Sequence, residues 1–143
     1  PEPRQTLAPD ARSIVQAHYR GWRSAASRWL ATCPTAERTF YAVTFEPRDG
    51  RALAAVVCIA EGDVASTVDV EGEVSNGTSY WYGDDDYFEH EPEIMAMMAT
   101  AQGLELYVRY PTMEGTHYAI WREVHNRWAI IQDDYDYWYD EGD

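Results

Sequence analysis

Residues 51–60 read Arg-Ala-Leu-Ala-Ala-Val-Val-Cys-Ile-Ala, and this stretch decides how the rest of the chain can be arranged. Its alternate positions form two apolar rows, Leu53, Ala55, Val57 and Ile59 on one side and Ala52, Ala54, Val56 and Cys58 on the other. A strand that is apolar on both faces is buried on both faces. We therefore expect a central strand, with its alanine-rich row open to the close approach of a helix.

The segment before it favours that helix. Apolar residues recur at helical spacing from Ala11 to Cys33, and Pro9 suits the first helical turn. We expect one long helix over about Pro9–Thr32, which ends near Pro34. If it packs on the alanine-rich row, its end brings Cys33 to Cys58, and we expect a disulfide that stabilises the fold by roughly 3 kcal/mol.

The remaining patterns predict further strands and a second helix. Strand-like alternation and turn signals such as Asn76-Gly77 mark segments on both sides of the central stretch. Pro92 and Gly103 bracket a segment in which Ile94, Met97 and Met98 have helical spacing. Besides 51–60, we expect strands near 38–46, 64–74, 104–110, 116–124 and 128–132.

Together these elements predict an α+β fold. A long N-terminal helix would pack on an antiparallel sheet of about six strands, with a short second helix between strands three and four. The 143 residues suit one domain, and 45% of them are hydrophobic. We divide the chain into a flexible lead-in at 1–8, a single domain at 9–139 and an acidic tail at 140–143.

Charge is distributed unevenly. Residues 1–60 carry eight Arg and five acids, a sum of +3, whereas residues 61–143 carry three Arg and twenty acids, a sum of −17. The whole chain therefore has a formal charge of −14. Such a field repels nucleic acid and anionic lipid and attracts basic proteins. We expect a basic protein partner, no nucleic acid and no insertion into a membrane, and the oligomeric state stays open.

Two segments, 80–93 and 133–141, interleave acids with large aromatic residues. Aromatic rings supply rigid contact area, and carboxylates select a cationic partner. We expect both segments to bind the partner through Trp81, Tyr82, Asp84, Asp85, Asp86, Tyr87, Glu89, Glu91, Asp133, Asp134, Asp136, Tyr137 and Trp138. A second acidic face is expected where alternate positions of one strand carry Asp69, Glu71 and Glu73.

Motifs that carry chemistry are missing. The chain has no nucleophile elbow, phosphate loop, dinucleotide fingerprint or Cys-x-x-Cys pair, and its four His residues are scattered singly. The best oxygen ligands for Ca²⁺ are Asp84, Asp85, Asp86, Glu89 and Glu91, but consecutive Asp residues lack the alternating spacing of a helix–loop–helix calcium site. A carboxylate pair for glycoside hydrolysis is formally possible, but any acidic protein supplies such pairs. We expect no catalytic residues, no metal and no cofactor.

The resulting hypothesis is an acidic protein-binding domain that neutralises a basic partner, as a bacterial immunity protein or toxin inhibitor does. One alternative is a DNA mimic that inhibits a nucleic-acid-binding protein. Another is an α+β domain that binds a carbohydrate or a small molecule. The polar start, Pro1-Glu2-Pro3-Arg4-Gln5, resembles a tether left after a leader is cleaved or a lipid anchor is attached. With the expected disulfide, it favours a periplasmic or secreted location.

Overall fold

The computed structural model describes residues 9–33, 35, 37–75, 78–81, 92–111 and 115–137, which form one short helix and nine strands. The predicted α+β fold is wrong, because the described residues are mostly β. The elements are α1 (Pro9–His18), β1 (Ser24–Cys33), β2 (Arg38–Phe45), β3 (Arg51–Ala60), β4 (Asp63–Ser75), β5 (Thr78–Trp81), β6 (Glu93–Thr100), β7 (Gly103–Pro111), β8 (Gly115–Val124) and β9 (Arg127–Tyr137).

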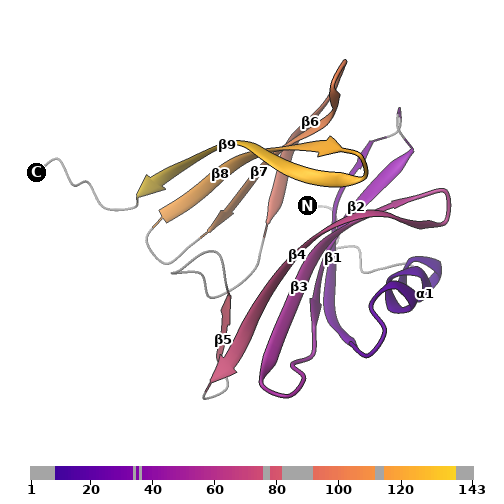
Figure 1. Cartoon of the computed structure of the whole chain (residues 1–143), viewed down its shortest axis with the longest axis vertical. Helices are drawn as coiled ribbons and strands as arrows, with labels where there is room; N and C mark the ends of the chain where they lie inside the picture. The colour runs from indigo at the N-terminus through magenta and orange to yellow at the C-terminus, as the bar shows by residue number, and fades with distance from the viewer. Residues whose placement is uncertain are drawn as a thin grey trace, which may run out of the picture.

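The strands form two antiparallel sheets in which sequence neighbours are also hydrogen-bonded neighbours. The N-terminal sheet has the order β1-β2-β3-β4-β5, and the C-terminal sheet has the order β6-β7-β8-β9. One face of the N-terminal sheet packs on the C-terminal sheet, whose strands cross it obliquely, and α1 lies on the opposite face (Figure 1). The described helix is not long and apolar enough to cross a membrane.

The expectation of a central strand at 51–60 is confirmed. β3 lies in the middle of its sheet and is buried from Ala52 to Cys58. The expected position of the helix is wrong, since α1 packs on the row that contains Leu53, Ala55 and Val57. The alanine-rich row faces the C-terminal sheet instead. Both apolar rows are therefore buried, each against a different layer.

Residues 24–33 form strand β1 rather than the second half of a long helix. The helix ends at His18, and Gly21 follows with a φ of +87°, a left-handed conformation that suits glycine. The pairing of β1 with β2 has register shifts at Ser24/Ala26 and Trp29/Ala31. Each bulge inserts an extra residue, so the alternation expected of a strand is lost and the apolar residues imitate a helical period.

The predicted second helix is wrong for the same reason. Residues 93–100 form β6, an edge strand with a register shift between Ile94 and Ala96. The extra residue, Met95, places Ile94 and Met97 on the inner face although they are three positions apart. Gly103, expected to end a helix, instead begins β7 after a tight turn.

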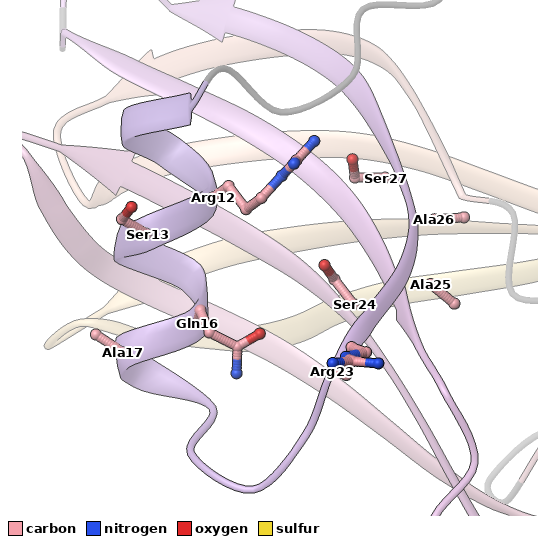
Figure 2. Close-up of a pocket in the computed structure, with 9 residues that line it drawn as sticks. All are labelled: Arg12, Ser13, Gln16, Ala17, Arg23, Ser24, Ala25, Ala26 and Ser27. Atoms are coloured by element: carbon pink, nitrogen blue, oxygen red, sulfur yellow. The ribbon is translucent and has the colours of Figure 1, made fainter.

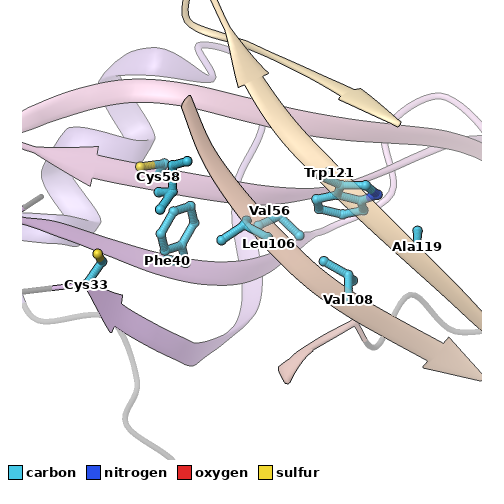
Figure 3. Close-up of a cluster of buried hydrophobic side chains, with 9 residues drawn as sticks. Cys33, Phe40, Val56, Cys58, Leu106, Val108, Ala119 and Trp121 are labelled. Carbon is cyan, nitrogen blue, oxygen red and sulfur yellow. The ribbon is translucent and has the colours of Figure 1, made fainter. Parts of the chain in front are cut away.

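The core between the sheets combines large side chains from both layers. Phe40 and Leu106 are fully buried, and Trp121 is buried beside them (Figure 3). The indole Nε1 of Trp128 in β9 donates a 2.8 Å hydrogen bond to the Ser66 hydroxyl in β4. An ion pair joins Arg38 of β2 to Glu123 of β8. These polar contacts join the two sheets and supplement the apolar packing between them.

The predicted disulfide is absent. Cys33 and Cys58, both within the described residues, are buried thiols that are not bonded to each other. Strand β2 separates them, since Cys33 pairs with Arg38, which in turn pairs with Ala60 of β3. Two strand spacings of about 4.8 Å exceed the Cα separation of about 4.4–6.8 Å that a disulfide spans. Figure 3 shows the two side chains on separate strands.

Candidate protein-binding surface

The outer face of the C-terminal sheet, which points away from the N-terminal sheet, is the main candidate surface. Among the described residues, the exposed large hydrophobic side chains all belong to β6, β8 or β9. Met95 is 55% exposed and Met98 is 52% exposed. No described helix or strand packs on this face, because α1 lies against the other sheet (Figure 1). Exposed apolar surface of this kind often marks an interaction site.

A hollow of about 460 Å³ lies across the middle of this sheet. The strand register aligns one residue from each strand, so Ala96, Tyr107, Ile120 and Gln132 form a row across it. The side chains of the residues next to this row point the other way, into the core; they are Leu106, Val108, Ala119 and Trp121. We call this hollow the outer groove; it is lined by Met95, Ala96, Tyr107, Val108, Tyr118, Ala119, Ile120, Gln132, Asp133 and Asp134.

The acids of β9 lie along one side of the outer groove. Residues 133–137 belong to β9, which the sequence patterns had predicted to end at Gln132. Asp134 pairs with Tyr118 and Asp136 with Thr116, so both carboxylates share the outer face. The two acids are exposed, and neither makes an ion pair with a described residue. Side chains two residues apart on one face are about 7 Å apart, so these charges repel each other.

Two of the three arginines on the described part of this face are already neutralised. Arg122 binds Glu105, with 2.7 Å between Nη2 and Oε2, and Arg109 binds Glu93, with 2.9 Å between the corresponding atoms. Glu105 is 8% exposed, so its negative charge is almost entirely compensated within the protein. The third, Arg127, begins β9 and pairs with Val124, at the other end of the strand from Asp134 and Asp136. The unpaired negative charge beside the outer groove therefore comes from these β9 carboxylates.

Asp133 lies apart from its two neighbours. It pairs with Ala119, which faces the core, and its Oδ2 is 3.8 Å from His117 Nε2. The ring of His117 contacts those of Tyr110 and Tyr135, with centroids 4.8 and 6.0 Å away. Sequence reasoning missed this cluster, because it treated His117 as a scattered residue. The only available signal was the alternation of β8, which places His117 on the same face as Ala119 and Trp121.

The second acidic face has the geometry that alternation predicts. Asp69, Glu71 and Glu73 are all exposed and pair with Ala55, Leu53 and Arg51 on the face that carries α1. Asp69 accepts a 2.5 Å hydrogen bond from the Tyr19 hydroxyl. Glu71 is 3.4 Å from the Arg51 guanidinium. This row is therefore engaged within the protein and is a weaker docking candidate.

Most of the first acidic–aromatic segment lies outside the described residues. This applies to Tyr82, Asp84, Asp85, Asp86, Tyr87, Glu89 and Glu91, and Trp138 of the second segment also lies outside them. The backbone of Trp81 lies in β5 and that of Tyr137 in β9, while their side chains are not described. The role predicted for these residues stays a prediction.

The described residues contain no group of three or more His, Cys, Asp or Glu side chains that could hold a metal ion. Comparison with protein-family models, curated proteins and solved structures finds no match to this chain. Functional inference therefore depends on the geometry and charge described above.

Proposed function

We propose that this chain is an acidic protein-binding domain that neutralises a basic partner protein, as a secreted or periplasmic inhibitor or an immunity protein does. One observation carries the proposal. A single sheet face combines an apolar hollow with the carboxylates of Asp134 and Asp136, which no described cation neutralises.

Each part of the face has a distinct task in this mechanism. The net charge of −14 steers a cationic protein toward the chain and raises the association rate at low salt. Tyr107 and Tyr118 line the outer groove and provide the contact area that loses water on binding. The β9 carboxylates accept hydrogen bonds from Arg or Lys of the partner, which relieves their mutual repulsion.

Carbohydrate binding is the second candidate, and the two tyrosines of the outer groove favour it. A hollow of about 460 Å³ is within the size range of small-molecule sites. Sugar binding to aromatic rings would depend little on salt, whereas binding of a cationic protein would weaken steeply as salt rises. The DNA-mimic alternative draws less support, because the regular row Asp69, Glu71 and Glu73 is engaged with Tyr19 and Arg51.

The test measures binding to a panel of purified basic wall hydrolases and nucleases at 20 and 300 mM NaCl, together with inhibition of each enzyme. We expect one panel member to bind tightly at low salt and to lose activity. Tyr118→Ala should weaken that binding by about 2 kcal/mol if Tyr118 lies at the contact centre. Asp134→Asn should mainly slow association and flatten its salt dependence.

Glu71→Gln is the matched control, since it removes one exposed carboxylate from the other sheet. It should change the affinity less than twofold. Equal effects of Glu71→Gln and Asp134→Asn would mean that only net charge matters and would refute the assignment of this face. Binding of oligosaccharides that is independent of salt, without inhibition of any basic enzyme, would favour the second candidate instead.

A further inference from the structure

A second hollow lies at the opposite, N-terminal side of the molecule, between α1 and β1. Its volume is about 840 Å³. The residues that line it are Arg12, Ser13, Gln16, Ala17, Arg23, Ser24, Ala25, Ala26 and Ser27 (Figure 2). None of the described residues that line it is acidic, although acids outnumber arginines by 25 to 11 in the full sequence. We call it the α1–β1 hollow.

The two arginines of this hollow lack a counter-ion. The guanidinium groups of Arg12 and Arg23 make no ion pair or hydrogen bond within the part of the chain that the structure describes. In contrast, Arg38, Arg51 and Arg122 each bind a carboxylate. Arg20 and Arg127 also lack a described counter-ion, so the distinguishing feature of Arg12 and Arg23 is that both line the same hollow. An anion that enters the hollow can gain a charge-assisted contact from either guanidinium group.

The surrounding groups complete an oxyanion site. Figure 2 shows Arg12 reaching from α1 across the gap toward β1, while Ser24 and Ser27 direct their hydroxyls into the gap. Guanidinium groups bind phosphate, sulfate and carboxylate oxygens in pairs, and serine hydroxyls can donate to the remaining oxygens.

We propose that the α1–β1 hollow binds a small organic oxyanion, whose phosphate or sulfate head contacts Arg12 or Arg23 and whose organic part occupies the rest of the hollow. The volume is within the range of about 300–1,000 Å³ that is typical of small-molecule sites and exceeds the needs of a bare ion. A nucleic acid or an anionic membrane is disfavoured, because the net charge of −14 repels an extended polyanion. This site is independent of the proposed docking of a basic protein on the other sheet.

The experiment titrates the full chain with phenyl phosphate, phenyl sulfate and inorganic phosphate, followed by amide NMR shifts and calorimetry at constant ionic strength. We expect saturable shifts confined to residues 12–27, with tighter binding of the phenyl esters than of inorganic phosphate. Arg12→Gln and Arg23→Gln should each weaken binding by about tenfold, because each removes a charge-assisted contact. Both residues are exposed, so the variants should keep the fold, which circular dichroism checks.

Arg20→Gln is the matched control, because Arg20 is exposed on the same segment but does not line the hollow. It should alter the affinity less than twofold. Equal weakening by Arg20→Gln, or the same shifts with added NaCl, would overturn the site. If inorganic phosphate binds as tightly as the esters, the proposal that the ligand is organic is wrong. If single-stranded DNA or anionic vesicles bind more tightly than the esters, the proposal that the ligand is a small anion is wrong.

Discussion

Tyr19 fastens α1 to the N-terminal sheet, and Tyr19→Phe tests this directly. The side chain is buried, its ring packs on Phe45 with centroids 4.8 Å apart, and its hydroxyl donates to Asp69. Phenylalanine keeps the ring and removes only the hydrogen bond. A hydrogen bond to a charged group contributes about 1.5–3 kcal/mol. Because Asp69 is exposed and regains water in the variant, we expect a loss near the lower limit, about 1.5 kcal/mol at pH 7.

The same contact predicts a pH dependence. Burial, and then the hydrogen bond to Asp69, raise the pKa of Tyr19 far above its ordinary value. The native state therefore holds the phenol proton more tightly than the unfolded state does. This contribution is fully present below the unfolded pKa of about 10 and is lost as pH rises above it. At pH 11 the loss is about 1.4 kcal/mol, so the advantage of the wild type over Tyr19→Phe should nearly vanish.

The assay is urea unfolding followed by tryptophan fluorescence at pH 7, 9, 10 and 11, with the difference in unfolding free energy taken at each pH. Other groups titrate in both proteins and cancel from the difference. Tyr118→Phe is the control, because it removes one phenol from the partly exposed outer face of the other sheet. A difference between wild type and Tyr19→Phe that stays constant from pH 7 to 11 would refute the reasoning.

Two further predictions concern the cysteines and the β6–β7 turn. Reductant should leave the melting temperature unchanged, because Cys33 and Cys58 are not bonded to each other. Iodoacetamide should label the two thiols only after unfolding, because both are buried and burial raises the pKa of Cys58. A lower melting temperature in reductant would contradict the first expectation. Gly103→Ala should destabilise the fold by about 1–3 kcal/mol, since its φ is +135°. A Cβ there would also lie 2.5 Å from the Glu123 carbonyl oxygen. Gly50→Ala, which has positive φ but open space, should cost less in the same thermal melts, and equal costs would exclude the steric explanation.

The candidate site shows which of its features residue patterns can predict and which they cannot. The alternation of residues 64–74 predicted that Asp69, Glu71 and Glu73 share one face, and they do. The same pattern could not predict that Tyr19 and Arg51 engage two of these carboxylates, because both partners come from other elements. Similarly, the outer groove is lined by residues of four strands, so it could be predicted only if the register of those strands were known.

The residue pattern of 51–60 was enough to predict that β3 is central, because two apolar rows on one strand require cover on both sides. The sequence by itself also determined the charge surplus of the second half, since net charge follows from composition alone. Only the tertiary structure decided which layer covers each row of β3 and that 24–33 and 93–100 are strands. The physical reason is that β-bulges shift the side-chain period locally, and whether a bulge forms depends on the pairing strand rather than on the segment itself.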